Sequence, residues 1–205
     1  MKLGVNVKRD TNEIVVTRNT NETNISVKVN MIQKKPLEID TTIPFLDHMI
    51  ETLAWRANIN IGVKIDKKVK LQHTIAEDVG ITLGKSIYEL FKVEIANGIE
   101  GFGFSKAILD EAIAEAIISI EGRINYIING PEFQDVDGIS GYNLVAFLEG
   151  FCQGCKCTLR LDYSGKDPHH SWEASFRALG YAIKNAFKKN VWRKGTISAI
   201  KGILE

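Results

Sequence analysis

The feature that most constrains the fold of this chain is an internal repeat. Two stretches of fifteen residues, HTIAEDVGITLGKSI from His73 and HHSWEASFRALGYAI from His169, align without gaps at an offset of 96 residues. The identical pairs are His73/His169, Glu77/Glu173, Leu83/Leu179, Gly84/Gly180 and Ile87/Ile183. Upstream, FLDHMIE at 45–51 aligns with NLVAFLE at 143–149. Such self-similarity predicts that the chain contains two copies of one supersecondary unit.

Hydrophobic patterning predicts the same order of elements in both copies. Runs rich in β-branched residues indicate strands at 23–31, 37–42, 59–65, 112–120, 126–128 and 158–163. Helical periodicity indicates helices at 44–57, 76–95, 144–152 and 172–187. We therefore expect an α+β fold of two ββαβα halves, about 18–98 and 99–190, within one domain that spans 1–205. Such halves place their sheets and helices in two layers around one core.

The composition is ordinary for a globular protein and excludes several classes of partner. With 26 Lys and Arg against 25 Asp and Glu, the net charge of +1 gives no electrostatic basis for binding nucleic acid or an anionic membrane. No apolar run approaches the roughly 20 residues that span a bilayer. The N-terminal sequence MKLGVNVKRD has no hydrophobic signal segment. We expect a cytoplasmic protein with no nucleic-acid partner and no membrane partner.

The three cysteines are clustered as Cys152, Cys155 and Cys157. An odd, clustered set is not a disulfide framework. The C-x-x-C-x-C spacing would suit a soft metal only with a fourth ligand from elsewhere, and the set spans a predicted helix end and strand start. Free cysteine is a common small buried hydrophobe, so we expect these residues in the core.

Histidine is concentrated where the repeat is strongest. Three of the four histidines, His73, His169 and His170, lie in the aligned segments, and His48 lies on the predicted helix before them. Each H-x-x-x-E motif places an imidazole and a carboxylate one turn apart on one helix face. A single pair of this kind is ordinarily a surface hydrogen bond. Two copies at duplicated positions favour metal binding, because imidazole and carboxylate are common ligands of Mn, Fe and Zn.

At these residues the chain resembles the imidazoleglycerol-phosphate dehydratase family. Short motifs match the family in order and spacing over nearly the whole chain. They are RNTNET at 18–23, FLDHM at 45–49, HTIAEDVGI at 73–81, DEA at 110–112, GR at 122–123, HHSWEASFRA at 169–178 and KG at 201–202. The resemblance implies the duplicated ββαβα fold, which is similar to domain 2 of ribosomal protein S5. It also implies a shell of 24 subunits with active sites where subunits meet.

The resemblance also implies a reaction. Family members dehydrate imidazole glycerol phosphate to imidazole acetol phosphate in histidine biosynthesis, using two manganese ions held by His and Glu ligands. A metal Lewis acid spreads the developing negative charge into the imidazole ring while a carboxylate removes the proton. The implied metal ligands are His48, His73, Glu77, His169, His170 and Glu173.

The remaining working groups are implied in the same way. Glu22 is the implied acid/base residue, with Asp110 as a second catalytic candidate; a solvated surface glutamate is the alternative for Glu22. The phosphate group of the substrate would be oriented by basic residues that do not join the chemistry. Those residues are Arg123, Arg177 and Lys201.

The chain departs from the family at two ligand positions. Thr74 stands where the family has the second histidine of its first pair; a one-residue insertion would instead make Gln72 and His73 the pair, again with one histidine. Ala146 stands where the second half of the family has a ligand histidine. If Thr74 and Ala146 belong to the same site, one site is intact and the other is degraded, and we adopt this case. Otherwise each site loses one ligand.

Phosphate-binding positions also differ. Gly101 stands in place of a family arginine, and Ala199 in place of a serine, although Ser198 is adjacent. Arg177 replaces a lysine, which keeps the charge and changes its geometry. An active dehydratase is the leading hypothesis, because most of the working groups remain. The alternative is a catalytically impaired or differently specific paralogue that acts as an assembly or binding protein. A hydrolase with a metal-bound water has no dedicated motif here.

Overall fold

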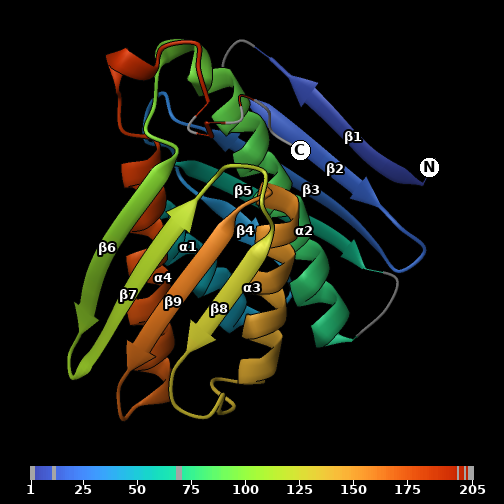
Figure 1. Ribbon diagram of the computed structural model, residues 1–205. Helices are drawn as coiled ribbons and strands as arrows, with labels where there is room; N and C mark the ends of the chain where they lie inside the picture. Colours follow the sequence, from blue (N-terminus) through green and yellow to red (C-terminus); the bar gives the residue numbers. More distant parts are fainter. Residues whose placement is uncertain (1–2, 11–12, 68–70, 198, 201, 203–205) are drawn as a thin grey trace.

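The computed structural model describes residues 3–10, 13–67, 71–197, 199–200 and 202 (Figure 1). The strands are β1 (Gly4–Arg9), β2 (Ile14–Asn19), β3 (Thr23–Asn30), β4 (Glu38–Asp40), β5 (Asn60–Lys67), β6 (Phe102–Leu109), β7 (Ala112–Ser119), β8 (Asn125–Asn129) and β9 (Thr158–Ser164). The α-helices are α1 (Pro44–Ala57), α2 (Gln72–Glu94), α3 (Gly141–Cys155) and α4 (Pro168–Ala186), with short 3-10 helices η1 (Ile95–Asn97) and η2 (Val191–Arg193).

Two sheets repeat one topology. The first has the strand order β1-β2-β3-β5-β4 and the second has the order β6-β7-β9-β8. In each sheet, the strand before the first helix pairs in parallel with the strand after it, and the other pairs are antiparallel. Apart from the edge strand β1, the two orders correspond strand for strand. The duplicated α+β fold is therefore confirmed.

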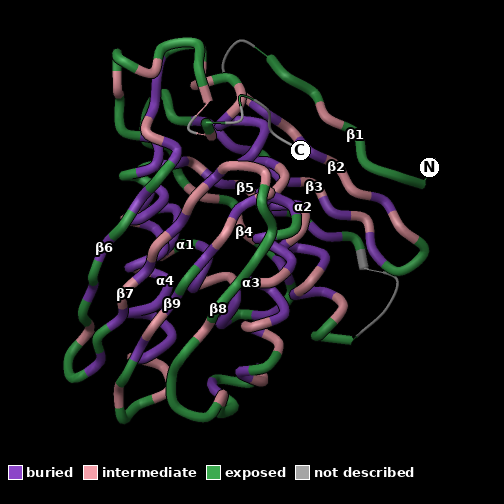
Figure 2. Tube along the Cα trace, viewed as in Figure 1, coloured by how far each residue is buried: buried purple, intermediate pink, exposed green. Residues whose placement is uncertain are grey.

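The α-helices lie between the two sheets (Figure 1). Helices α1 and α2 pack on the first sheet, and α3 and α4 pack on the second. The halves meet helix to helix, with α2 on α3 and α1 on α4. Each half is a sheet covered by a layer of helices, and the two helix layers face each other. Figure 2 shows buried residues along the helices and, between less buried ones, along the strands. The buried apolar residues form a continuous cluster that includes Phe147, Phe151 and Trp172.

The sequence pattern did not predict three strands, β1 and β2 at the start of the first sheet and β6 at the start of the second. The pattern fails for β6 because its buried side consists of small residues such as Gly103 and Ser105, while Phe102 and Phe104 face outward. The inner residues are small because α4 lies very close. A Cβ atom on Gly103 would lie 1.8 Å from the carbonyl oxygen of Ala182.

The predicted helices are all present, with some ends shifted. Helix α1 matches the predicted range, whereas α2 and α4 each begin four residues before their predicted starts. The additional first turns carry His73 and His169, which contribute no apolar periodicity. The three cysteines are buried and unpaired in the core, as expected. Within the described ranges, no helix is long and apolar enough to cross a membrane.

Candidate metal site

Three of the predicted ligands converge between α1 and α4, and we call them the His–Glu cluster: His48, His169 and Glu173. The Nε2 atom of His48 lies 3.2 Å from Oε2 of Glu173. The Nε2 atom of His169 lies 3.4 Å from the same oxygen. One ligand atom from each residue lies within 4.8 Å of the other two. The fold therefore brings a histidine of the first repeat against the H-x-x-x-E motif of the second.

The start of α4 determines which of its two histidines enters the cluster. Pro168 lies in the first turn, where its missing N–H has no partner to lose. The Asp167 side chain caps the helix by accepting the backbone N–H groups of His169 at 2.7 Å and His170 at 3.4 Å. His169 then shares a helix face with Glu173, one turn away. His170 is rotated by about 100° around the helix axis and points elsewhere.

Glu173 is held as an oriented, charged carboxylate. Its side chain is 11% exposed. Arg177, one turn further along α4, donates from Nε and Nη2 to Oε1 of Glu173 at 3.0 and 2.7 Å, which leaves Oε2 directed at the histidines. Burial alone would raise the pKa of Glu173, but hydrogen bonds from Arg177 and His48 outweigh burial and lower that pKa. The carboxylate is therefore ionised and able to act as a ligand at neutral pH.

The spacing of the His–Glu cluster fits a divalent transition-metal ion. Ligand atoms about 2.1 Å from one ion are about 3.0–3.4 Å from one another at octahedral or tetrahedral angles. The separations of the two histidines from Glu173, 3.2 and 3.4 Å, lie in that range, and all three ligand atoms lie within 4.8 Å of one another. Two histidines and one carboxylate leave further coordination positions open. Those positions are available to a substrate atom or to a ligand from a second chain.

His170 lies outside the His–Glu cluster and meets a second pair of carboxylates. Its Nδ1 atom is 2.9 Å from Oε2 of Glu111, and its Nε2 atom is 3.4 Å from Oδ2 of Asp110. Glu111 also accepts the backbone N–H groups of Asp167 and Lys166 at 2.9 and 3.1 Å. Hydrogen bonds from the Asp167 backbone and the His170 side chain lower the pKa of Glu111 to about 2. The hydrogen bond to Glu111 in turn raises the pKa of His170.

The packing of α2 on α3 reproduces the packing of α4 on α1. A Cβ atom on Gly84 of α2 would lie 2.1 Å from the carbonyl oxygen of Phe151 on α3. A Cβ atom on Gly180 of α4 would lie 2.7 Å from the carbonyl oxygen of Leu53 on α1. These glycines are partners in the sequence repeat, and the residues that they contact are 98 apart. Positions on α1 and α3 that differ by 98 are therefore equivalent.

This equivalence places Ala146 at a second, incomplete half-site. Ala146 is 98 residues after His48, so it stands beside His73 and Glu77 as His48 stands in the His–Glu cluster. A methyl group cannot bind a metal. Among the described residues, His73 and Glu77 belong to no group of three converging ligands. Thr74 corresponds in the repeat to His170, which lies outside the His–Glu cluster.

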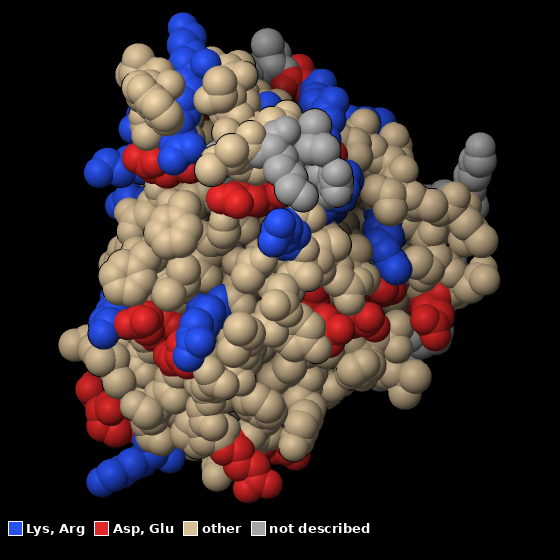
Figure 3. Space-filling model, in the orientation of Figure 1, with Lys and Arg blue, Asp and Glu red and all other residues tan. Residues whose placement is uncertain are grey.

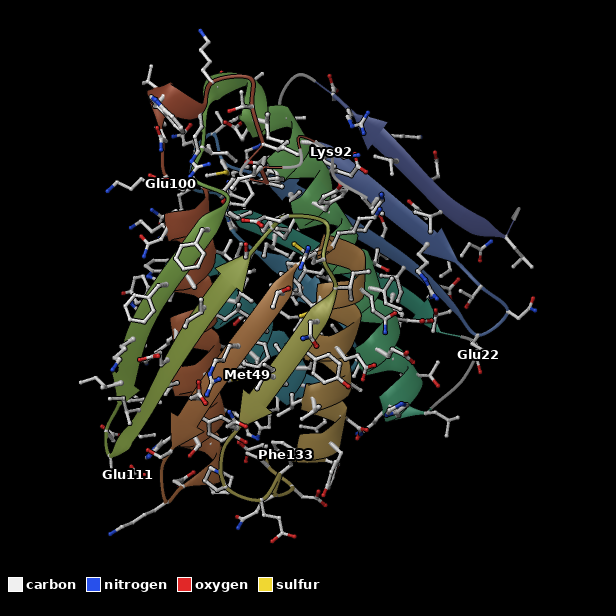
Figure 4. The ribbon with its side chains drawn as sticks, viewed as in Figure 1. Glu22, Met49, Lys92, Glu100, Glu111 and Phe133 are labelled. Atoms are coloured by element: carbon white, nitrogen blue, oxygen red, sulfur yellow. The ribbon has the colours of Figure 1, made fainter. Side chains whose placement is uncertain are left out.

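Glu22 lies away from the His–Glu cluster, in the turn between β2 and β3 (Figure 4). The hydroxyl of the next residue, Thr23, donates to Asp78 of α2, so this turn is tied to the helix that carries the incomplete half-site. In the second repeat, Glu111 lies in the corresponding turn between β6 and β7, on the opposite side of the molecule in Figure 4. The structure does not bring Glu22 to the cluster of its own chain.

The predicted phosphate-binding residues are dispersed. Arg177 lies at the His–Glu cluster, whereas Arg123 is exposed just before β8. Lys201 and Ser198 lie outside the described residues. Gly101 has a φ of +72° and donates its N–H to the carbonyl oxygen of Ala186 at 2.9 Å, so this position serves the entry into β6.

A groove leads from the His–Glu cluster along α1 and α4. A hollow of about 270 Å³ is lined by His48 and Glu173 of the cluster together with Glu51, Arg56 and Arg177. An adjoining hollow of about 350 Å³ shares both arginines and adds Lys106 and Tyr181. The Nη1 atom of Arg56 donates to the hydroxyl of Tyr181 at 3.1 Å. Guanidinium groups in such a groove can bind an anionic group of a small molecule.

Sequence reasoning missed several residues that complete these surroundings. Arg56 and Lys106 carry no motif, and they meet in the groove only through packing of α1, β6 and α4. Asp137 and Glu111 hydrogen-bond the two adjacent histidines from 32 and 59 residues away. No spacing rule in the sequence connects these two loop residues with the histidines at the start of α4.

Comparison with known proteins identifies one family. The family model for imidazoleglycerol-phosphate dehydratase matches residues 41–183. The dehydratase of Nitrosomonas europaea is 34% identical, over 92% of this chain and 96% of that protein. The dehydratase of Methanocella arvoryzae is 36% identical, over 92% of this chain and 97% of that protein. The crystal structure from Pyrococcus furiosus superposes with a TM-score of 0.78 at 27% identity, over 91% of this chain and 99% of that one. The Staphylococcus aureus structure, at 21% identity, over 87% of this chain and 99% of that one, shows the same fold with a TM-score of 0.76.

Proposed function

The chain belongs to the imidazoleglycerol-phosphate dehydratase family, and we propose that it catalyses the dehydration for which the family is named. The reaction eliminates water from imidazole glycerol phosphate and gives imidazole acetol phosphate, a step of histidine biosynthesis. The protein is thus a metal-dependent hydro-lyase with a small-molecule phosphate substrate. The observation that carries the proposal is the convergence of the His–Glu cluster beside a groove that contains Arg56 and Arg177.

Different residues of the chain have different proposed roles in this reaction. Mn²⁺, when bound, supplies a Lewis acid that draws charge into the imidazole ring as the adjacent carbon loses its proton. The His–Glu cluster would hold the ion, and Arg177 keeps the cluster carboxylate ionised and oriented. Proton removal requires a base within hydrogen-bond reach. Glu22 is the proposed acid/base residue, and Asp110 is the second catalytic candidate.

The position of Glu22 bears on where the active site forms. Glu22 is remote from the His–Glu cluster of its own chain, so it would serve the cluster of a second copy across an interface. We therefore propose a homo-oligomer, with the 24 subunits implied by the family resemblance. Large side chains such as Phe102, Phe104 and Tyr126 are exposed on the outer face of the second sheet, where Figure 3 shows broad areas without charged side chains. Surfaces of this kind are typical of contacts between proteins.

The phosphate group of the substrate is proposed to bind basic residues at one end of the site. Arg177 is the candidate within the groove, and Arg123 and Lys201 are the candidates beyond it. Arg56 and Lys106 add positive charge to the same groove. Bidentate arginine contacts orient a phosphate without taking part in the chemistry.

The metal content is proposed to be one complete site and one degraded site per chain. The complete site is the His–Glu cluster. The degraded site would contain His73 and Glu77, with Ala146 in place of a third ligand, and His170 remains a proposed ligand outside both groups. Metal analysis of purified protein should find one tightly bound Mn²⁺ per chain. Two tightly bound ions per chain would contradict this account.

The test of the proposed function is a dehydratase assay with imidazole glycerol phosphate and added Mn²⁺. Wild-type protein should form imidazole acetol phosphate, and Glu22→Gln should lower the rate at least 100-fold, since general acid–base groups contribute about 10²–10⁴-fold. No turnover at any Mn²⁺ concentration would favour the alternative, a catalytically impaired or differently specific paralogue that assembles or binds. The basis of that alternative is the loss of family metal-binding or phosphate-binding residues at Thr74, Gly101, Ala146 and Ala199.

We further propose a cytoplasmic location and one domain made of two repeats, about 18–98 and 99–190. The apolar interior shared by the two halves supports the single domain. The near-neutral net charge supports the absence of nucleic-acid and membrane partners.

A further inference from the structure

The imidazole of His169 has a carboxylate near each of its two ring nitrogens. Its Nδ1 atom lies 2.6 Å from Oδ2 of Asp137, a residue of the loop between β8 and α3. Its Nε2 atom lies on the opposite edge of the ring, 3.4 Å from Oε2 of Glu173. Asp137 is not itself part of the His–Glu cluster. The ring therefore joins an outer carboxylate to the ligand cluster.

A histidine binds a metal through a ring nitrogen that carries no proton, so its other ring nitrogen carries the proton and needs an acceptor. A carboxylate that accepts this proton fixes the tautomer, fixes the rotation of the ring and makes the ligand nitrogen more basic. Asp137 stands where such an acceptor is required. With Nδ1–H donated to Asp137, the lone pair of Nε2 faces the remaining cluster atoms.

The loop that carries Asp137 is anchored, although the Asp137 side chain is exposed. Val136 and Ile139 are buried, and their backbone groups hydrogen-bond each other in both directions at 2.9 Å. Gln72, at the start of α2, donates its side-chain amide to the carbonyl oxygen of Gly138 at 3.0 Å. Asp137 itself has a φ of +44°, in the left-handed region that aspartate tolerates better than most residues. The loop thus presents the carboxylate from a fixed backbone.

We propose that Asp137 is a positioning residue of the metal site, which accepts the Nδ1 proton of His169 and so presents Nε2 to the ion. This inference rests on the proposed metal site and adds a residue to it. The ligands of the His–Glu cluster could be inferred from sequence motifs, whereas Asp137 is visible only in the folded chain.

The test compares Mn²⁺ binding by purified proteins, followed by the electron paramagnetic resonance signal of free Mn²⁺. Asp137→Gly removes the carboxylate and keeps the left-handed backbone accessible, and it should weaken Mn²⁺ binding about 10- to 100-fold. Asp137→Asn keeps a neutral acceptor and should bind with intermediate affinity. Asp135→Asn removes the same charge from the same loop, at an exposed residue, and should bind like wild type.

The outcomes separate this inference from the proposed function, because metal binding is measured without turnover. Equal Mn²⁺ affinity in Asp137→Gly and wild type would overturn the role of Asp137 and leave the dehydratase proposal standing. An equal loss in Asp135→Asn would also overturn it, since loop charge alone would then be responsible. Melting temperatures of the metal-free proteins should agree within about 2 °C; a large drop for Asp137→Gly with normal binding in Asp137→Asn would indicate a purely structural role. Wild-type protein that binds no Mn²⁺ would overturn both proposals.

Discussion

Glu89 is a buried carboxylate of α2 surrounded by cations, and its replacement gives a measurable test of what holds β1 to the helix layer. Its side chain is 2% exposed. Lys85 and Lys92 lie 3.0 and 2.9 Å from Oε1, and Arg9 of β1 donates from Nε to Oε2 at 3.1 Å. Burial alone would raise the pKa of Glu89, but the hydrogen bonds from Lys92, Arg9 and Lys85 outweigh burial and hold the pKa at about 2.

The magnitude follows from that pKa. A value of about 2 instead of the ordinary 4.5 is equivalent to about 3 kcal/mol of stability at neutral pH, because each pKa unit is worth about 1.4 kcal/mol. The side chains of Lys85 and Lys92 are about one third exposed, and that of Arg9 is 53% exposed. Solvent screening of these partners reduces the expected effect to about 2 kcal/mol. Glu89→Gln should lower the free energy of unfolding by this amount at pH 7.

The pH dependence gives the sign of the effect. A carboxyl group whose pKa is lowered by folding contributes its full stability above its unfolded pKa and loses that contribution as the pH falls toward its folded pKa. The difference between wild type and Glu89→Gln should therefore be constant above about pH 5 and should vanish between about pH 4.5 and 2. Urea unfolding followed by circular dichroism at pH 7, 5, 4 and 3 measures this difference. Glu115→Gln, which breaks an exposed ion pair with Lys106, is the matched control and should cost less than about 1 kcal/mol.

A stability difference that stays the same from pH 7 to pH 3 would show that the charge of Glu89 does not stabilise the fold. The same would follow if Glu89→Gln were no less stable than Glu115→Gln at pH 7. In either case water would solvate the cations around Glu89 as well as the carboxylate does. Their attraction to Glu89 would then only offset the free-energy cost of burying the carboxylate.

Three further predictions concern packing, the degraded half-site and the groove. Gly103→Ala should lower the free energy of unfolding by about 2–4 kcal/mol, because its methyl group would overlap the Ala182 carbonyl. The melting temperature should fall accordingly, and an unchanged melting curve would contradict the close packing of β6 on α4. Ala146→His should raise the tightly bound Mn²⁺ from one to two per chain, as counted by elemental analysis, and an unchanged count would show that a third ligand is not what the half-site lacks. Arg177→Lys keeps the charge but loses the two-nitrogen contact that orients Glu173. The site should then hold the substrate less well, and steady-state kinetics should show a KM about tenfold higher, the equivalent of about 1.4 kcal/mol; an unchanged KM would show that this contact does not serve substrate binding.

Sequence and structure agree where the repeat carries the information. The helices, six of the strands and the convergence of His169 with Glu173 follow from periodicity and from four-residue spacing. Strand β6 was not predictable, because its inner residues are small to admit α4 and its large residues face outward. His48 of the first repeat lies beside His169 and Glu173 of the second repeat because of how the two halves pack against each other. No local pattern records that contact.

The surroundings of the ligands are a second limit of sequence reasoning. Asp137 and Glu111 reach the adjacent histidines from loops, and their roles depend on the exact path of those loops. Glu22 shows the reverse situation. Its motif identified it as a candidate, yet the single chain keeps it away from the His–Glu cluster, so its role depends on an assembly of several copies.

We propose that this chain is a dehydratase whose metal is held by the His–Glu cluster. The most direct measurement is the Mn²⁺ dependence of imidazole acetol phosphate formation by wild type, His48→Ala and His73→Ala, with Mn²⁺ binding measured on the same samples. We expect saturable, chelator-sensitive turnover for wild type, loss of both turnover and tight Mn²⁺ binding in His48→Ala, and retention of the tight ion in His73→Ala. Turnover and tight binding that survive in His48→Ala, or a wild-type protein that binds Mn²⁺ and forms no product at any concentration, would show that the His–Glu cluster is not the metal site of a dehydratase.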